Sequence, residues 1–272
     1  MNRKQFIQLA GSAIVLLANG KITKANVLSG FSKGKNGPLF RFAVASDGHY
    51  GEKNTDFQNH FSTIVTSINK DHAQDPFKFA VINGDIVHDD KSHFPAAKLA
   101  LDALHCKYYV SQGNHDHVTH QEWESIWGMP VNFDFTYKKC AFLIATTSNE
   151  SGEYLCPDID WLSEKLHKHR KKEVFIFIHI NPGALTKHAV DCPRLFEVLG
   201  KHKNIRAVFN GHDHDEDGVK VKNNIPFLFD AHFGGSWGTE YRGYRVVEVM
   251  KDGSVMTFIM NPTHSINREN LK

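Results

Sequence analysis

Short apolar runs that each end in carboxylate or imidazole side chains constrain this chain more than any other feature. The run 79–82 leads into Asn83, Gly84 and Asp85. The same pattern recurs at residues 41–45 before Asp47 and His49, 108–110 before Asn114 and His115, 174–178 before His179, and 206–209 before His212 and His214. Because the carboxyl ends of strands in α/β proteins face one common crevice, we expect these side chains to meet there.

These side chains suit a metal site. Aspartate and histidine together favour Zn, Mn or Fe. The Asp-x-His and His-x-His spacings place two ligands on one side of an extended backbone, since side chains alternate with period two. One carboxylate, Asp85, shared by two ions permits the separation of roughly 3.5–4 Å typical of two-metal centres. With 18 histidines in the chain a single one means little, but the ordered set predicts a binuclear site.

Hydrophobic periodicity predicts the fold class. Helical spacing over 56–70 and 96–104 separates the first three strands, which is the pattern of a largely parallel sheet. A helix over 119–127, a hairpin of 133–137 with 140–146, and helices over 157–169 and 195–199 follow. After residue 219 we expect only strands. The prediction is an α+β, four-layer fold: two packed mixed β-sheets (a β-sandwich) flanked by helices. The first half should build one sheet and the C-terminal strands much of the other.

Composition and charge limit the partners. The 272 residues, 41% hydrophobic and 23% charged, fit a single domain over 38–272 after a linker over 26–37. Without the first 25 residues the formal charge changes from +2 to −2, so the body lacks the basic excess of a nucleic-acid binder. No run approaches the roughly 18 apolar residues of a bilayer span. We therefore expect no nucleic acid duplex as partner and no stable membrane anchor.

The N-terminus has the layout of an export signal. Arg3 and Lys4 precede a mostly apolar stretch over 6–18, and small or polar residues with Lys21 and Lys24 follow. That order is typical of a secretory signal peptide, which we place at residues 1–25. The expected location is the periplasm or the outside of the cell. The alternative is a retained N-terminal helix on a cytoplasmic protein.

The four cysteines lack the CxxC spacing of a zinc ribbon or a thioredoxin motif. Cys106 and Cys140 lie at predicted strand starts, where buried thiols are expected. Cys156 and Cys192 each precede a proline in a predicted loop. Pairing of these two in an oxidising compartment and two separate thiols are both open at this point.

The motifs together resemble those of the calcineurin-like metallophosphoesterases. The matching pieces are Asp47-Gly48-His49, Gly84-Asp85, Gly113-Asn114-His115-Asp116, His179 and Gly211-His212-Asp213-His214. The resemblance implies a first metal on Asp47, His49, Asp85 and His214, and a second on Asp85, Asn114, His179 and His212. It also implies that His115 is the catalytic histidine near the leaving group and that Asp116 orients it. The cofactors would be two divalent or trivalent ions of Mn, Fe or Zn.

Departures from the family pattern narrow the branch. Serine/threonine phosphatases carry an arginine shortly after the Gly-Asp aspartate and a glutamate after the Gly-Asn-His histidine. This chain has Ile86-Val87-His88-Asp89 at the first place and Asp116 at the second. Purple acid phosphatases have a ligand tyrosine after Gly-Asp, and none is present here. The length leaves no room for the C-terminal domain of the nucleotidase branch. The chain thus resembles the bacterial branch that includes cyclic-nucleotide and glycerophosphodiester phosphodiesterases.

The expected function is hydrolysis of small-molecule phosphoesters, with phosphodiesters as the leading class. A hydroxide bridging the two metals would attack phosphorus, while Asn114 neutralises charge on the phosphoryl oxygens. His115 would stabilise or protonate the leaving alkoxide. The alternatives are a nucleotidase-like phosphomonoesterase and a metal-binding module that has lost turnover.

Two further features have open interpretations. His88, three residues after Asp85, is either a group that supports the centre or a histidine on a helix face. The glycine-rich stretch 231–238, with Trp237, is either a substrate-facing loop or a turn between two strands.

Overall fold

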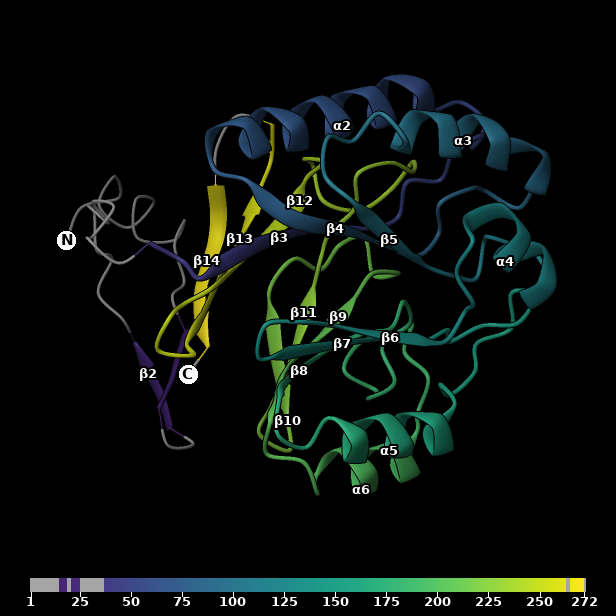
Figure 1. The fold of residues 1–272 in the computed structure, drawn as a ribbon. Coiled ribbons are helices and arrows are strands. Elements are labelled where there is room, and N and C mark those ends of the chain that lie inside the picture. The colour runs from purple at the N-terminus through teal and green to yellow at the C-terminus, as the bar shows by residue number, and fades with distance from the viewer. Residues whose placement is uncertain (1–14, 19–20, 25–36, 263–264, 272) are drawn as a thin grey trace, which may run out of the picture.

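The computed structural model describes residues 15–18, 21–24, 37–262 and 265–271. Within them the chain forms four layers, with helices outside and two β-sheets packed face to face between them (Figure 1). This arrangement confirms the predicted fold class.

The first sheet has eight strands in the order β2-β1-β14-β13-β12-β3-β4-β5. Its centre is the parallel set β3, β4 and β5, with β12 antiparallel to β3. The strands are β1 (Val15–Ala18), β2 (Lys21–Lys24), β3 (Phe40–Ala45), β4 (Phe77–Asn83), β5 (Tyr108–Ser111), β12 (Tyr244–Val249), β13 (Val255–Met260) and β14 (Ser265–Leu271).

The second sheet has six strands in the order β10-β11-β9-β8-β7-β6. β7, β8, β9 and β11 are parallel, and β6 and β10 pair antiparallel at the two edges. The strands are β6 (Phe133–Tyr137), β7 (Cys140–Ile144), β8 (Glu173–Phe177), β9 (Ile205–Asn210), β10 (Val219–Lys222) and β11 (Ile225–Phe229).

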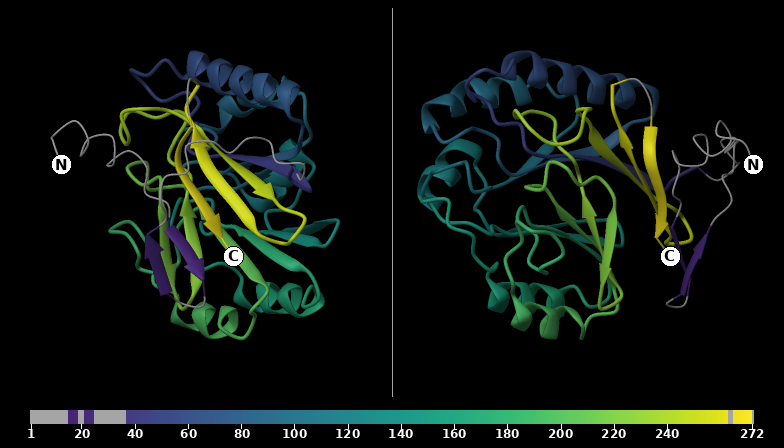
Figure 2. Two further views of the ribbon diagram at one scale, coloured as in Figure 1. Left: turned by 90° about the vertical axis from the view of Figure 1, so that its left-hand side faces the viewer. Right: turned by 180° about the vertical axis from the view of Figure 1, so that it is seen from behind.

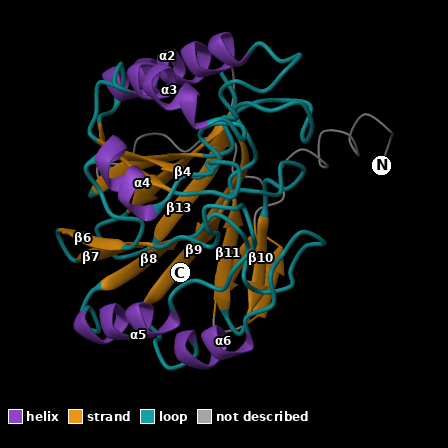
Figure 3. Ribbon diagram, turned by 90° about the vertical axis from the view of Figure 1, so that its right-hand side faces the viewer, coloured by secondary structure: helices purple, strands orange, loops and turns teal. Residues whose placement is uncertain are grey.

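Helices cover the outer face of each sheet (Figure 3). Those on the first sheet are α2 (Phe57–Gln74) and α3 (Phe94–Leu101), which follows the short 3-10 turn η1 (Lys91–His93), and those on the second are α5 (Ile159–Lys168) and α6 (Pro193–Leu199). α4 (His120–Trp127) follows the β5 end of the first sheet. Its capping box joins Thr119 and Glu122, and Gly128 ends it in the left-handed region, so the local sequence sets both limits.

Strand periodicity divides the core into layers. Along β3, Phe42 and Val44 face the second sheet, whereas Ala43 and Ala45 face the helices. Phe42 is fully buried, and its ring centroid lies 5.1 Å from that of Phe79 on the neighbouring strand. It also meets rings of β7, β8 and β9 across the interface. The aromatic layer therefore holds the two sheets, and the loops at their ends, in a fixed relation.

The expectation that the C-terminal strands build much of the second sheet is wrong for β12, β13 and β14. Those strands lie in the first sheet beside β3, and the second sheet is built by residues 133–229 (Figure 2). The physical reason is that β3 would otherwise have an open edge. Residues 245–249 of β12 cover that edge with a continuous antiparallel ladder to β3.

The predicted export segment and linker lie mostly outside the described residues. Of the segment 1–25, only β1 and β2 are described, and they form a hairpin in which β1 pairs parallel to β14. The linker 26–37 is described only at Gly37. In the part of the chain that is described, no helix combines the length and the apolar character needed to cross a membrane.

Candidate metal centre

The predicted ligands all follow strand ends at one edge of the two sheets. β3, β4 and β5 of the first sheet, and β8 and β9 of the second, each end two to four residues before a predicted ligand. Every predicted ligand is buried. The set is Asp47, His49, Asp85, Asn114, His179, His212 and His214.

The ligand atoms form two groups. Asp47, His49 and His214 offer atoms that all lie within 4.8 Å of one another, and Asp85, His179 and His212 do the same. In the first group the His49 and His214 Nε2 atoms are 3.0 Å apart, and His214 Nε2 is 3.2 Å from Asp47 Oδ1. This division is the one that the family resemblance implies.

Asp85 lies between the two groups. Its Oδ2 is 3.0 Å from His179 Nε2 in one group and 3.7 Å from His49 Nε2 in the other. The Oδ1 atom accepts a hydrogen bond of 2.8 Å from the His115 backbone N–H, which fixes the orientation of the carboxylate. Asp85 is therefore placed to be shared by two ions.

Three of the ligand atoms are buried without a hydrogen-bond partner. They are Asn114 Oδ1, His179 Nε2 and His212 Nε2, the non-carboxylate atoms of the second group. An unsatisfied buried polar atom costs about 1–3 kcal/mol. A cation that replaces the proton on His179 would satisfy all three atoms at once, so the residues present fit a metal ion.

The outer ring nitrogens have partners that fix the ring orientations. His179 Nδ1 donates to the Asn83 carbonyl at 2.6 Å, and His214 Nδ1 lies 3.2 Å from the Trp237 carbonyl. His49 Nδ1 lies 3.0 Å from His88 Nδ1. Such contacts hold Nε2 toward a metal and are usual around metal-binding histidines. For His88 they favour the interpretation in which it supports the centre.

The backbone at the centre differs from the expected extended geometry. Asp47, His49, Asp85 and His212 have φ of 60°, 46°, 50° and 67°. They lie in turns after the strands, so period-two alternation does not explain why the paired ligands meet. Non-glycine residues in the left-handed region cost about 1–3 kcal/mol each and cluster at functional sites.

Glycines allow the close approach of neighbouring segments to these turns. A Cβ on Gly211 would clash with the Asp47 carboxylate and with Ser46. One on Gly113 would clash with the Asp85 carboxylate. The glycines of the Gly-Asn-His and Gly-His-Asp-His motifs are thus required by the packing of the ligands themselves.

Burial and charge set the protonation of the ligands. Burial lowers the pKa of His49 to about 3 and that of His212 to about 4, so both rings are neutral and ready to bind a cation. Burial also acts against charge on His179, but Asp85 and Asp47 outweigh it and raise the pKa of His179 to about 10. The proton on His179 occupies the position where the carboxylates attract positive charge.

Metal binding should therefore depend on pH. Because the raised pKa of His179 lies above neutrality, a metal ion that binds Nε2 must displace a proton. We expect the affinity of the metal-free protein for Mn²⁺ to weaken about tenfold per pH unit as the pH falls. Calorimetric titrations in buffers of different ionisation enthalpy measure the protons released. An affinity that is independent of pH, with no proton release, would contradict this.

His115 lies beside the ligand groups and is one-third exposed. Its Nδ1 donates to Asp89 Oδ1 at 2.6 Å, and its ring stacks on His88 with centroids 4.8 Å apart. Burial lowers the pKa of His115, but Asp85 and Asp89 outweigh it and raise that pKa above the ordinary value. The ring can therefore hold a proton for a leaving group.

Asp116 does not orient His115 in this structure, contrary to the expectation. Its Oδ1 accepts from the Ile86 and Val87 N–H groups at 2.8 and 3.1 Å, and its Oδ2 accepts from Gly113 N–H at 2.7 Å. Backbone amides saturate the carboxylate, so it ties the loop after β4 to the loop after β5. Asp89, four residues after Asp85, accepts the hydrogen bond that orients the His115 ring. A carboxylate four residues after the Gly-Asp aspartate is the sequence feature that points to this contact.

The family model of the calcineurin-like phosphoesterases matches residues 40–216, more than half of the chain. This chain belongs to that family. The match spans every predicted ligand and His115, and the two buried ligand groups fit a dimetal centre. The protein is thus a hydrolase that acts on small phosphoesters. A search of curated protein sequences finds no match.

Solved structures share the fold of this calcineurin-like phosphoesterase at low identity. A dimetal phosphatase from Danio rerio has a TM-score of 0.68 and 12% identity over 86% of this chain and 99% of that one. Purple acid phosphatase PPD1 from yellow lupin has a TM-score of 0.61 and 11% identity, over 85% of this chain and 53% of that one. The calcineurin-like phosphoesterase YfkN from Bacillus subtilis has a TM-score of 0.52 and 15% identity, over 84% of this chain and 93% of that one.

Asp89 gives the calcineurin-like centre a testable pH response. The Asp89→Asn change removes a carboxylate that raises the pKa of His115, so the protonated ring is lost at a lower pH. We expect the basic limb of the pH–rate profile to move toward lower pH while the metal content stays at the wild-type value. A loss of rate without movement of that limb would instead indicate a purely structural role for Asp89.

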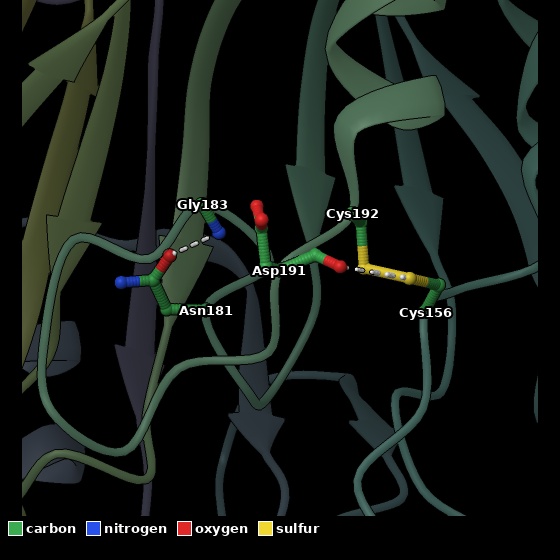
Figure 4. Close-up of a disulfide and its surroundings, with 5 residues drawn as sticks. All are labelled: Cys156, Asn181, Gly183, Asp191 and Cys192. Atoms are coloured by element: carbon green, nitrogen blue, oxygen red, sulfur yellow. Dashed lines mark hydrogen bonds between the residues drawn. A yellow bond between two sulfur atoms is a disulfide. The ribbon is translucent and has the colours of Figure 1, made fainter.

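A disulfide joins two loops of the second sheet (Figure 4). Cys156, after β7, bonds to Cys192, after β8, across 36 residues of sequence. In the second loop the Asn181 side chain accepts a 2.8 Å hydrogen bond from Gly183 N–H. Cys106 and Cys140 are free and buried, as predicted.

Removing the disulfide should lower stability. A cross-link over a loop of this length stabilises a fold by about 2–4 kcal/mol, mainly by restricting the unfolded chain. We expect the double change Cys156→Ala and Cys192→Ala to lower the free energy of unfolding by about that amount in urea titrations. The wild-type protein under reducing conditions is the matched control. Equal stability of the oxidised and reduced proteins would show that the bond contributes nothing.

Proposed function

We propose that this chain is a phosphodiesterase that acts at a two-metal centre. The observation that carries the proposal is the pair of buried ligand groups that share Asp85, with the Asp89-paired His115 beside them. When bound, the two ions lower the pKa of a water molecule and neutralise charge on the phosphoryl group.

The side chains of the chain supply orientation and a proton. The Asn114 amide donates to a phosphoryl oxygen if its carbonyl oxygen holds the metal. His115 keeps a proton on Nε2 for the leaving oxygen, because Nδ1 is committed to Asp89. No nucleophilic side chain is required in this scheme.

Charge around the centre favours a diester. The charged groups that act most strongly on Asp47, His49 and Asp85 are aspartates and histidines. A phosphomonoester dianion brings one more negative charge than a diester monoanion, and proteins commonly meet it with Arg or Lys. The branch that we propose is that of the cyclic-nucleotide and glycerophosphodiester phosphodiesterases, in line with the motif departures.

Hydrolysis of two chromogenic esters tests the proposal. We expect the Mn²⁺-loaded protein to hydrolyse bis(p-nitrophenyl) phosphate with a higher kcat/KM than p-nitrophenyl phosphate. The reverse preference would replace the proposal with a phosphomonoesterase. Two bound metals with no turnover of either ester would favour a binding module.

We also propose that the protein is exported to an oxidising compartment. The Cys156–Cys192 disulfide supports this, since structural disulfides persist mainly outside the cytoplasm. Expression of the full chain in a Gram-negative host, with fractionation and mass determination, is the test. Retention of the intact chain in the cytoplasm, with both thiols reduced, would contradict export.

A further inference from the structure

Three ring side chains lie at the edge of the metal centre without being predicted ligands, and we call them the aromatic rim. The Trp237 ring stacks on His214, with centroids 4.3 Å apart and an interplanar angle of 7°. The Tyr154 ring meets His212 edge-on at 4.8 Å and 88°. His188 lies 5.9 Å from Trp237 and 6.1 Å from His212. Each ligand group thus has an aromatic ring against one of its histidines.

Two of the rim rings, Tyr154 and Trp237, are exposed although they are large and mostly apolar. Tyr154 is 43% exposed and Trp237 46% exposed, and Leu155 next to Tyr154 is 42% exposed. Within residues 37–262, the only other large apolar side chains that are this exposed are Leu99 and Val221. One side of each rim ring contacts a ligand histidine, so the exposed part faces away from the ligand group. Clustered exposed apolar surface at the edge of a site is typical of ligand contact.

The loops that carry the rim are held in place. The disulfide ties the loop of Tyr154 to the loop of His188, and Leu155 N–H donates to Thr147 O at 2.8 Å. Lys220 and Lys222 donate to carbonyls of the His188 loop. Arg242 donates to Gly235 O at 2.8 Å in the loop of Trp237. A rim fixed before binding loses little conformational entropy when it contacts a ligand.

We propose that the aromatic rim binds a planar ring of the substrate, so that the enzyme selects phosphoesters whose organic group carries an aromatic or heteroaromatic ring. The inference rests on the proposed function and specifies its substrate class. Trp237 offers a face for stacking beside one ligand group, and Tyr154 offers a ring beside the other. A planar ring gains from stacking on either, whereas a saturated ring of equal size gains less.

The competing explanation is that the rim rings only pack around His212 and His214. In that case, changing them would alter metal content or affinity for inorganic phosphate, and the preference among organic groups would stay the same. Binding of matched ligands to the metal-loaded protein separates the two explanations without relying on turnover.

The experiment compares phenyl phosphate, cyclohexyl phosphate and inorganic phosphate by calorimetric titration of the full Mn²⁺-loaded chain. We expect phenyl phosphate to bind at least about fivefold more tightly than cyclohexyl phosphate. The ratio should fall to about two or less in Trp237→Leu and should be largely kept in Trp237→Phe. Leu99→Ala, which changes an exposed side chain on α3, is the matched control. Tyr154→Leu is the second variant, in case Trp237→Leu loses metal.

The outcomes distinguish the inference from the proposed function. A ratio near one in the wild-type protein, or a ratio unchanged in both Trp237→Leu and Tyr154→Leu, would overturn the inference while leaving the phosphodiesterase intact. Equal losses for all three ligands, together with lost metal, would assign the rim a packing role and also overturn it. A metal-loaded wild-type protein that binds none of the three but hydrolyses bis(p-nitrophenyl) phosphate would overturn the inference alone. A metal-loaded protein that also fails to hydrolyse that diester would overturn the proposed function itself.

Discussion

Replacing Asp85 with alanine should reduce the metal content from about two ions to one or none and lower turnover by more than ~10²-fold. The Asp85 carboxylate lies between the two ligand groups, at 3.0 Å from His179 Nε2 and 3.7 Å from His49 Nε2. Its removal therefore weakens both sites together. Asp47 Oδ1 also lies near both groups, at 3.2 Å from His214 Nε2 and 3.6 Å from His179 Nε2.

Metal analysis and thermal unfolding measure this effect. Added Mn²⁺ should raise the Tm of the wild-type protein, because a ligand that binds only the folded state stabilises it, and should raise that of Asp85→Ala much less. Asp85→Asn is a useful companion, since the amide oxygen still accepts from His115 N–H while the charge is lost. Asp160→Ala, at an exposed carboxylate on α5, is the control. Wild-type metal content in Asp85→Ala would refute the shared site.

Replacing His115 with alanine should lower turnover by at least ~10²-fold while both metals stay bound. His115 contacts Asp89 and stacks on His88, and a ring nitrogen of His115 lies within 4.8 Å of ligand atoms of His49 and His88. His115 is outside the two buried groups that share Asp85. The loss should be larger for an alkyl diester than for bis(p-nitrophenyl) phosphate, because p-nitrophenolate departs without a proton.

Steady-state rates and metal content of His115→Ala, measured with both esters, test this role. Asn114→Ala should also lose at least ~10²-fold but should bind less metal, since Asn114 Oδ1 is one of the unpartnered buried acceptors. Circular dichroism of both variants controls for folding. Hydrolysis rates close to wild type in both variants would contradict the mechanism.

The sequence predicts those parts of the centre that depend on strand ends. Asp47, Asp85 and His179 each follow a buried run, and parallel strands bring their ends together whatever the rest of the chain does. The sequence predicts the four layers equally well, because apolar residues of β3 point alternately into the two cores on either side of the first sheet. Local signals also set the limits of α4.

Other parts depend on long-range packing that periodicity does not encode. The edge of β3 pairs with β12, and the sequence of β12 alone does not indicate this pairing. Asp116 is next to His115 in the sequence and Asp89 is 26 residues away, but backbone amides bind the Asp116 carboxylate and leave Asp89 to contact the ring. The left-handed backbone at Asp47 and His49 likewise arises from close contact between loops, through Asp47 N–H to Gly84 O and His49 N–H to Asp85 O.

The most direct test of the central claim is the rate of bis(p-nitrophenyl) phosphate hydrolysis as Mn²⁺ is returned stepwise to the metal-free protein. Two ligand groups joined by Asp85 predict little activity in the absence of metal and a rate that rises until about two equivalents are bound. A full hydrolysis rate in the metal-free protein, or a rate that reaches its maximum while no metal is measurably bound, would contradict the account.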